Sequence, residues 1–475
     1  MKNRTYDFLV LGGGSAGYAA ARTAHDLGLS TAVVDGAAEL GGLCILRGCM
    51  PSKTLIESSN RYRSMRRASE FGLRSGNTEV HIDEIIARKR RLIGEFAEYR
   101  QGQLTDGRFD LHRGRGIFSG THSVTVRPLD GSPDYELKFR SGFIATGSRI
   151  SHVPIPGLEE VGYWTSDDVL DAEAVPESIL VLGGGAIALE MACYFEGLGK
   201  EVSVIQRSGQ LLSGADPDIA AALEQALTQR ENLQVYTGTS LQSASLNPET
   251  GKKQITFEQG NQSVTLDCDQ ILVALGRVPN SGGLHLSAAG VELEGESGQV
   301  KTDSRQRTTA DAIFAGGDVC GPHEIVHIAI EQGEIAATNA AILLGKLDQA
   351  ERFIDYRLKL LGIFTDPEVA MVGYSESEAE AAGIEIAKAS ASFDDHGKSM
   401  VRGERHGFVK MIVDVANGKL IGASAVGPEA VEIIHEVVVA MHFHATAAEF
   451  LKIPHYHPTL SEIWTYPAED LSIYG

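Results

Sequence analysis

The chain has 475 residues, which is enough for about two to four domains, each with a substantial core. Its 42 basic and 63 acidic residues give a net charge of −21, which argues against nucleic acid or an anionic membrane as a partner. Five cysteines in a chain of this length do not make a disulfide scaffold.

The first predicted element is a buried parallel strand at residues 6–10, followed by the turn LGGGSAG and an alanine-rich helix. Gly12, Gly14 and Gly17 have the G-x-G-x-x-G spacing that lets a backbone approach a pyrophosphate. The next strand ends at Asp35, where an acid can bind a ribose hydroxyl. The stretch therefore predicts a nucleotide site rather than a secretory signal, and we expect a cytosolic protein without a membrane span.

Two cysteines, Cys44 and Cys49, lie in the next stretch, GGLCILRGCMPSK. Pro51 favours the first turn of a helix, so Cys49 is expected at or just before a helix N-terminus. The amides and the dipole at that position stabilise a thiolate. A structural pair or half of a metal site is the alternative, but a reducing cytosol favours a catalytic pair.

The middle of the chain begins with a charged helical stretch at residues 60–105 and short strands at residues 110–150. These strands end in FIATGS, where Thr146 and Gly147 can approach a bound nucleotide closely. A later apolar strand ends at Asp318, which can bind ribityl or ribose hydroxyls or can simply close a turn.

The opening motif recurs in ILVLGGGAIALE, which places Gly183, Gly185 and Ala188 at the same spacing. This repeat predicts a second dinucleotide site. The acid expected after the next strand is missing, because Gln206 occupies that place and Arg207 follows it. A guanidinium pairs with a 2′-phosphate, which favours NADPH over NADH, and an ordinary surface arginine is the alternative.

From about residue 350 the pattern changes to α+β, with half-buried strands and a helix at residues 427–444. The stretch IPHYHPTLSE then places His457 five residues before Glu462. A carboxylate at this spacing can hold an imidazole in one tautomer for acid–base chemistry. Such a pair taken alone is more often structural.

In their order along the chain, these motifs resemble the flavin-dependent disulfide oxidoreductases that include dihydrolipoamide dehydrogenase, glutathione reductase and mercuric reductase. The resemblance covers essentially the whole chain. It implies an α/β fold with two Rossmann-like dinucleotide-binding domains, for FAD and NAD(P), and an α+β C-terminal dimerisation domain. The implied FAD-binding domain covers residues 1–150 and continues at 279–349. The implied NAD(P)-binding domain covers 151–278, and the interface domain covers 350–475.

The resemblance implies distinct roles for the two cysteines and the histidine. Cys49 would be the thiol next to the flavin, and Cys44 the interchange thiol that attacks the substrate disulfide. His457, oriented by Glu462, would be the acid–base that exchanges the proton of the interchange thiol. In the family this histidine comes from the partner subunit, so a homodimer is implied.

The resemblance also assigns cofactor contacts, and it assigns no metal. Lys53 and Glu190 would form an ion pair beside the flavin. The residues implied for FAD are Gly12, Gly14, Gly17, Asp35, Lys53, Gly116, Thr146, Gly147 and Asp318. The residues implied for the nicotinamide nucleotide are Gly183, Gly185, Glu190, Arg207 and Gly276.

The sequence indicates the disulfide chemistry more narrowly than it indicates the substrate. The residues after Cys49 and the stretch HYHPTLSE look most like dihydrolipoamide dehydrogenase, whereas the second nucleotide site looks more like glutathione and mercuric reductases. We expect a dihydrolipoamide dehydrogenase-like enzyme that acts on a small-molecule or protein-bound disulfide, including a lipoyl carrier. The alternatives are an NADPH-dependent reductase of another small disulfide or of mercuric ion, a flavin-only transhydrogenase or diaphorase, and a docking subunit of a multienzyme complex.

Overall fold

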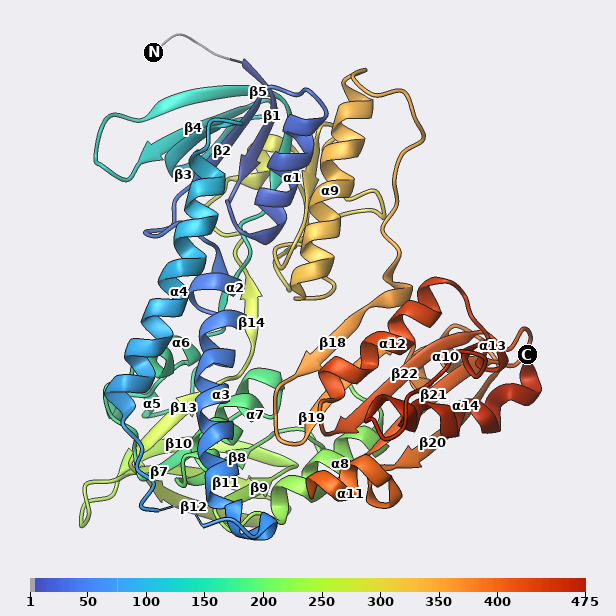
Figure 1. Cartoon of the computed structure of the whole chain (residues 1–475). Helices are drawn as coiled ribbons and strands as arrows, with labels where there is room; N and C mark the ends of the chain where they lie inside the picture. Colours follow the sequence, from blue (N-terminus) through green and yellow to red (C-terminus); the bar gives the residue numbers. More distant parts are fainter. Residues whose placement is uncertain (1–4, 75) are drawn as a thin grey trace. The chain divides into compact units, whose positions relative to one another are not determined.

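The computed structural model of the protein describes residues 5–74 and 76–475. The chain forms two compact units, each assembled from three segments that Figure 1 colours by sequence. The first unit comprises Met1–Ser52, Ala87–Ser151 and Arg277–Asp355, and the second comprises Lys53–Ile86, His152–Gly276 and Tyr356–Gly475. Residues 53–86, which the sequence places with the first domain, thus group with the second unit.

One mixed sheet is the centre of the first unit. Its strands are β1 (Thr5–Leu11), β2 (Thr31–Asp35), β3 (Asp110–Gly120), β4 (Ser123–Pro128), β5 (Tyr135–Ile144) and β17 (Ile313–Ala315). β1 pairs in parallel with both β2 and β5, and β17 pairs in parallel with β5. β3, β4 and β5 form an antiparallel meander. The apolar strand predicted at residues 6–10 therefore lies inside the sheet, where both of its faces are buried.

Two helices, α1 (Ser15–Asp26) and α9 (Val326–Leu343), pack together on the side of the sheet to which Phe8 and Val10 contribute (Figure 1). Small residues permit this close approach, because a Cβ on Gly333 would collide with the backbone of Ala16. The alternate β1 residues contribute to a second apolar cluster, as the two-residue period of a strand requires.

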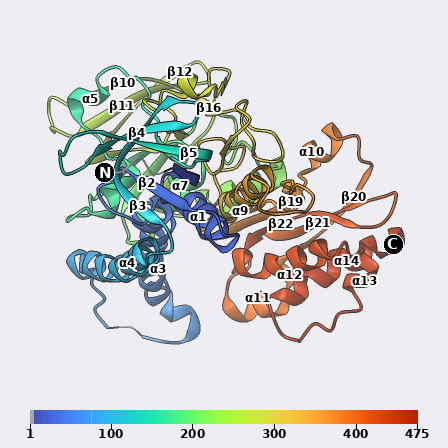
Figure 2. The same ribbon diagram turned by 90° about the horizontal axis from the view of Figure 1, so that it is seen from above.

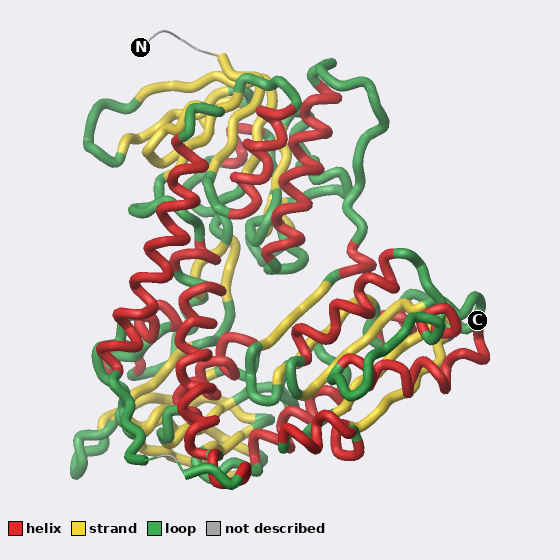
Figure 3. The backbone as a smooth tube through the Cα atoms, in the orientation of Figure 1, coloured by secondary structure: helices red, strands yellow, loops and turns green. Residues whose placement is uncertain are grey.

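The first unit also contains short strand pairs and parts of two long helices (Figure 3). The remaining elements here are α2 (Leu43–Leu46), α3 (Cys49–Arg66), α4 (Ile82–Thr105), β6 (Ser148–Ile150), β14 (Arg277–Pro279), β15 (Leu293–Glu294) and β16 (Gln299–Val300). The charged helical stretch predicted at residues 60–105 is thus parts of two helices, α3 and α4. None of the helices within the described ranges is long and apolar enough to span a bilayer.

The second unit contains a parallel sheet built from the repeated motif. Its strands are β13 (Gln270–Val273), β7 (Ser178–Leu182), β8 (Glu201–Ile205) and β9 (Leu233–Tyr236), in that order across the sheet. The associated helices and antiparallel strands are α5 (Leu158–Val161), α6 (Ser166–Leu170), α7 (Ala186–Gly197), α8 (Pro217–Thr228), β10 (Thr239–Leu246), β11 (Lys253–Gln259) and β12 (Gln262–Cys268). The strand–turn–helix order of β7 and α7 repeats that of β1 and α1.

The C-terminal part of the second unit is an antiparallel sheet in the order β18-β19-β22-β21-β20. Its strands are β18 (Leu360–Ile363), β19 (Glu368–Gly373), β20 (Ile386–Ser392), β21 (Phe408–Asp414) and β22 (Leu420–Gly427). The helices of this part are α10 (Glu376–Ala381), α11 (Gly397–Arg402), α12 (Ala430–His442), α13 (Ala447–Phe450) and α14 (Thr465–Leu471), of which α12 and α14 cover one face of the sheet (Figure 2). Trp464 is fully buried beneath them, and its indole N–H donates to the Ile433 carbonyl at 3.0 Å.

A buried ion cluster in the second unit joins the start of α8 to the C-terminal antiparallel sheet. Lys410 of β21 is 2% exposed, and its Nζ lies 2.8 Å from a carboxylate oxygen of each of Asp216, Asp218 and Glu376. These three carboxylates lie within 4.8 Å of one another, as metal ligands would. The Lys410 ammonium already bonds to each of them, so it takes the place that a metal cation would have.

Candidate functional site

The turn between β1 and α1 has the geometry of a dinucleotide site. Gly12 has a φ of 102°, and a Cβ there would collide with the Ala145 carbonyl oxygen. A Cβ on Gly17 would collide with the Gly12 carbonyl, so helix and strand approach each other only because both residues are glycine. The N-cap of α1 is Gly14, which has no side chain, so the first amides of the helix receive no side-chain cap from it.

Asp35, at the end of β2, lies beside this turn. Its Oδ2 accepts a hydrogen bond from the Gly13 N–H at 2.8 Å, and its Oδ1 accepts one from the Ala37 N–H at 2.9 Å. Arg113 Nη1 lies 3.2 Å from Oδ1. The spacing predicted an acid at the position where a dinucleotide presents its ribose, and these bonds hold Asp35 there.

Of the other residues implied for FAD in the first unit, Thr146, Gly147 and Asp318 lie together, whereas Gly116 lies within a strand. The turn after β5 lies next to Asp318, because the Ser148 hydroxyl donates to Asp318 Oδ2 at 2.6 Å. In the same turn Thr146 donates to the Asn280 carbonyl at 2.8 Å, and Gly147 has a φ of 69°. This part of the fold therefore brings the predicted Thr146, Gly147 and Asp318 together.

Gly116 has a different environment from the turn residues. It lies within β3, opposite Val126 of β4. A Cβ on Gly116 would lie 2.7 Å from Leu11 Cδ2, so the absence of a side chain is required for packing inside the sheet. The FAD contact implied for Gly116 remains a prediction.

The cysteine stretch packs directly on the dinucleotide turn. Cys49 is the first residue of α3, as the following proline predicted, and Cys44 lies in α2. Gly42 has a φ of 79°, and a Cβ there would lie only 2.7 Å from Gly14 Cα. A Cβ on Gly48 would lie 3.2 Å from Cys44 Cα, so the chain returns to Cys44 just before Cys49 begins the helix. Both half-buried cysteines thus lie at the N-terminal end of α3, next to the turn between β1 and α1.

The ion pair predicted between Lys53 and Glu190 is present within the second unit. Lys53 Nζ donates to both carboxylate oxygens of Glu190, at 2.9 and 2.7 Å. The Glu190 side chain is 5% exposed, and it also accepts the Phe364 N–H at 3.1 Å. Lys53 Nζ lies 4.8 Å from the centroid of the Phe364 ring. A buried carboxylate is held charged only with such partners, so the pair orders this end of α7.

The histidine and the glutamate near the C-terminus form the contact predicted from their spacing. His457 Nδ1 lies 2.9 and 3.1 Å from the two carboxylate oxygens of Glu462. The His457 side chain is 78% exposed, whereas that of Glu462 is 12% exposed. The buried carboxylate therefore orients the imidazole through Nδ1.

A further residue of this site, His396, was not predicted from the sequence. It is 1% exposed, and its Nε2 lies 3.5 Å from Glu462 Oε1. Its Nδ1 lies 3.1 Å from the Ser399 hydroxyl. Burial lowers the pKa of His396, which favours the neutral ring, while the charge of Glu462 opposes this shift. No motif links His396 to Glu462, because the contact arises only when α11 packs near the C-terminal segment.

The second glycine-rich turn, between β7 and α7, repeats the geometry of the first. Gly183 has a φ of 121°, and a Cβ there would collide with the Ala274 carbonyl. Gly185 is the N-cap of α7, again without a capping side chain. Ala188 is fully buried at the position where the first turn has its third glycine, and Gly276 has a φ of 98°. The second turn thus has the same backbone geometry as the first, as the repeated spacing predicted.

The end of β8 lies at this second turn. The side chain of Gln206 packs on Gly184, whose Cβ would lie 2.9 Å from it. Gln206 is half-buried, and Arg207 is exposed. Within the described residues, no hydrogen bond or ion pair holds the Arg207 guanidinium, so it is available to a ligand.

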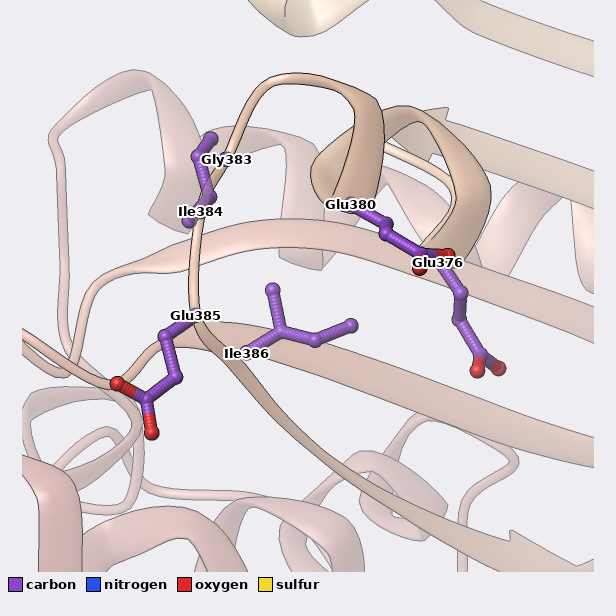
Figure 4. Close-up of a pocket in the computed structure, with 6 residues that line it drawn as sticks. All are labelled: Glu376, Glu380, Gly383, Ile384, Glu385 and Ile386. Carbon is purple, nitrogen blue, oxygen red and sulfur yellow. The ribbon is translucent and has the colours of Figure 1, made fainter.

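The second unit also has a surface pocket. Its lining residues are Glu376, Glu380, Gly383, Ile384, Glu385 and Ile386. Figure 4 shows Ile386 between the side chains of Glu376 and Glu385. None of the predicted site residues lines this pocket, and Glu376 is already bound by Lys410 and Lys388. We assign the pocket no part in the reaction.

Known proteins match this chain over nearly its whole length. Residues 6–333 match the family model described as pyridine nucleotide-disulphide oxidoreductase, and residues 361–468 match the dimerisation domain of that family. A dihydrolipoyl dehydrogenase of Bacillus subtilis is 32% identical over 466 residues, which are 96% of each chain. The dihydrolipoyl dehydrogenase of Thermus scotoductus is 33% identical over 472 residues, or 98% of each chain.

Two solved structures have a similar fold. LpdA of Mycobacterium tuberculosis superimposes with a TM-score of 0.86 and 28% identity, covering 98% of this chain and 99% of that one. The HOCl-induced flavoprotein disulfide reductase RclA of Escherichia coli gives a TM-score of 0.84 and 26% identity with the same coverage. Both likenesses extend over the glycine-rich turns, the cysteine stretch and the C-terminal sheet.

Proposed function

We propose that the chain, which belongs to the pyridine nucleotide-disulphide oxidoreductase family, exchanges electrons between a nicotinamide nucleotide and a dithiol–disulfide substrate through Cys44 and Cys49. It is an FAD-dependent disulfide oxidoreductase that resembles dihydrolipoyl dehydrogenase. The observation that carries this proposal is the packing of Gly42, two residues before Cys44, on Gly14 of the first dinucleotide turn. This contact supports a position of the cysteine pair beside the FAD pyrophosphate.

FAD, when bound, supplies hydride acceptance from the nicotinamide and two-electron exchange with a disulfide. Its fit is supported by the uncapped amides of α1, by Asp35 at the ribose position and by Asp318 next to the Thr146 turn. The second turn, with Gly183 and Gly185, would hold the nicotinamide nucleotide.

The thiol steps follow from where the two cysteines lie. In the reductive direction the Cys44 thiolate attacks one sulfur of the substrate disulfide, which forms a mixed disulfide and releases the first substrate thiolate. The Cys49 thiolate then attacks Cys44 Sγ, which closes the Cys44–Cys49 disulfide and releases the second thiolate. Cys49 is suited to the thiolate form, because it begins α3 and the helix N-terminus stabilises negative charge.

We assign the proton transfers to His457. Its Nδ1 is bound by Glu462, so Nε2 would protonate the leaving thiolate or accept a proton from the interchange thiol. The high exposure of His457 supports a homodimer in which the histidine serves a site across the subunit interface. The match of residues 361–468 to the family dimerisation domain supports the same assembly.

The test is a steady-state screen of NADH and NADPH with lipoamide, oxidised glutathione and mercuric ion. We expect lipoamide reduction that Cys44→Ser abolishes, while reduction of a quinone or dye acceptor persists, since that reaction needs no thiol. The retained dye reduction shows that the variant is folded and binds its flavin. Lipoamide reduction that survives in Cys44→Ser would refute the proposal and favour a flavin-only diaphorase.

For the nicotinamide nucleotide we propose NADPH, on the evidence of Gln206 and Arg207 alone; the likeness to dihydrolipoyl dehydrogenases lends this choice no support. Gln206 removes the acid that would repel a 2′-phosphate, and the exposed Arg207 can pair with that phosphate. We expect Arg207→Glu to lower the NADPH/NADH ratio of kcat/KM by about tenfold or more. Arg127→Glu, at an arginine whose side chain is 64% exposed, is the matched control. An unchanged ratio in Arg207→Glu would exclude this role.

A further inference from the structure

Three arginines of the first unit surround the ring of Tyr18, a buried residue in the first turn of α1. The guanidinium carbon of Arg100 lies 4.0 Å from the ring centroid, that of Arg108 lies 5.8 Å from it, and that of Arg22 lies 6.0 Å from it. Arg108 Nη2 also donates to the Tyr18 hydroxyl at 3.2 Å. The ring face stabilises a desolvated cation, and Arg100 is closest to it.

Two of these arginines are neutralised by carboxylates. Arg22 Nη2 lies 2.6 Å from Glu334 Oε1, and Arg108 Nε lies 2.7 Å from Asp106 Oδ2. Arg100 has no such partner within residues 5–74 and 76–475. Its Nη1 is buried and makes no hydrogen bond to any described residue. A buried guanidinium donor without an acceptor lowers the free energy of unfolding, and a ligand that accepts a hydrogen bond from this nitrogen would remove that cost.

The position of Arg100 is tied to the cysteine stretch. The neighbouring Gln101 donates from Nε2 to the Leu40 carbonyl at 3.4 Å, four residues before Cys44. Tyr18 and Leu40 pack in the same apolar cluster. Burial lowers the pKa of the Arg100 guanidinium, and the Cys44 thiol is among the groups that oppose this shift. Tyr18 lies one turn along α1 from its N-cap Gly14, on which Gly42 packs two residues before Cys44, so Arg100 and the cysteine stretch lie at the same end of α1.

A second group on the same face of α4 is also without a partner. Gln103 follows Arg100 by three residues, so the two side chains are neighbours on the helix surface. Gln103 Oε1 is buried and makes no hydrogen bond to any described residue. Arg100 and Gln103 thus place an unsatisfied donor and an unsatisfied acceptor one turn apart on this face of α4.

We propose that Arg100 binds an anionic group of the disulfide substrate next to Cys44, so that the enzyme acts preferentially on a negatively charged disulfide rather than on a neutral one. The inference rests on the proposed function, because it assigns the charge of the substrate that meets Cys44. It also accounts for an unneutralised cation in a chain whose net charge is −21, since the acidic protein would otherwise repel such a substrate.

Lipoate and lipoamide provide a matched pair of substrates, because they share the dithiolane ring and differ in a carboxylate against a carboxamide. We expect the FAD-loaded wild-type enzyme to have the higher kcat/KM with lipoate. Arg100→Gln should lower kcat/KM for lipoate by about tenfold and change it for lipoamide by less than about twofold. Arg100→Lys, which keeps the charge, should recover part of the loss. Arg91→Gln is the control, since Arg91 is on the same helix, 63% exposed and paired with Glu95.

Three results would overturn the inference. An equal loss for both substrates in Arg100→Gln would mean that Arg100 acts on the Cys44 thiolate. A weaker affinity for FAD, measured by flavin fluorescence, would mean that Arg100 binds the cofactor phosphates. Unchanged values for both substrates would mean that it has no part in recognition. Failure of the proposed function is distinguishable, because the wild-type enzyme would then reduce neither disulfide while it still reduced a dye.

Discussion

Gly42 is the contact through which the cysteine stretch rests on the dinucleotide turn, and Gly42→Ala tests it. An alanine Cβ would lie 2.7 Å from Gly14 Cα, whereas ordinary contact begins at 3.4 Å, so the two segments must separate by about 0.7 Å. The overlap costs about 1–3 kcal/mol. The φ of 79° adds a further cost of about 1 kcal/mol for any residue with a Cβ.

Gly28→Ala is the control that separates these two costs. Gly28 has a φ of 78°, nearly that of Gly42, but no heavy atom of the described residues lies within 4 Å of its Cβ position. Both variants therefore carry the backbone strain, and only Gly42→Ala carries the overlap. The difference between them isolates the contact between the cysteine stretch and the dinucleotide turn.

The assay is the dissociation constant of FAD, measured by flavin fluorescence, together with the melting temperature. The displaced turn must return to its place to bind the cofactor, so the overlap should weaken FAD binding. We expect Gly42→Ala to bind FAD about 5- to 150-fold more weakly than Gly28→Ala, the factor that corresponds to 1–3 kcal/mol. Equal dissociation constants for the two variants would refute the reasoning.

Three further predictions concern the second unit. Glu462→Gln should lower disulfide turnover by about tenfold or more, because His457 loses its orienting carboxylate. Reduction of the flavin by NAD(P)H, measured by stopped flow, should stay unchanged. Slower flavin reduction would contradict this assignment. Burial raises the pKa of Glu368 from 4.5 to about 7. Between these two pH values the Glu368 carboxyl is protonated in the folded state and ionised in the unfolded state. The free energy of unfolding should therefore fall by up to about 3 kcal/mol as the pH rises from about 4.5 to 7, and urea denaturation of Glu368→Gln should show a smaller fall than wild type. Lys410→Met should destabilise the fold by about 3–5 kcal/mol in urea, because the buried Asp216 carboxylate loses its cation, and a stability within 1 kcal/mol of wild type would exclude this role.

Much of the fold was predictable because its signals are local. The turn at Gly12 needs glycine for its own φ, and the helix beginning at Cys49 follows from the proline two residues on. The contact between His457 and Glu462 also follows from a spacing of five residues. In each case the residues that interact are close in sequence, so the local sequence pattern predicts their contact.

Contacts between distant segments could not be predicted in this way. His396 and Glu462 are 66 residues apart in the chain, and only the packing of the C-terminal part brings them to 3.5 Å. Arg100 belongs to a stretch whose pattern predicts only a charged helix, yet it lies against Tyr18, one turn from the α1 N-cap on which the cysteine stretch packs. No periodicity distinguishes Arg100 from the other arginines of α4, since its lack of an acceptor is visible only when its neighbours are known.

The sequence by itself determined the two dinucleotide turns, the cysteine pair at a helix start and the α+β C-terminal part, because each depends on backbone preferences within one short stretch. The tertiary structure decided that Gly42 rests on Gly14, that His396 lies 3.5 Å from Glu462 and that Arg100 has no carboxylate partner among the described residues. These features depend on which segments meet and on which polar groups find partners there. That outcome is a property of packing across the whole unit, and no single stretch of the chain contains it.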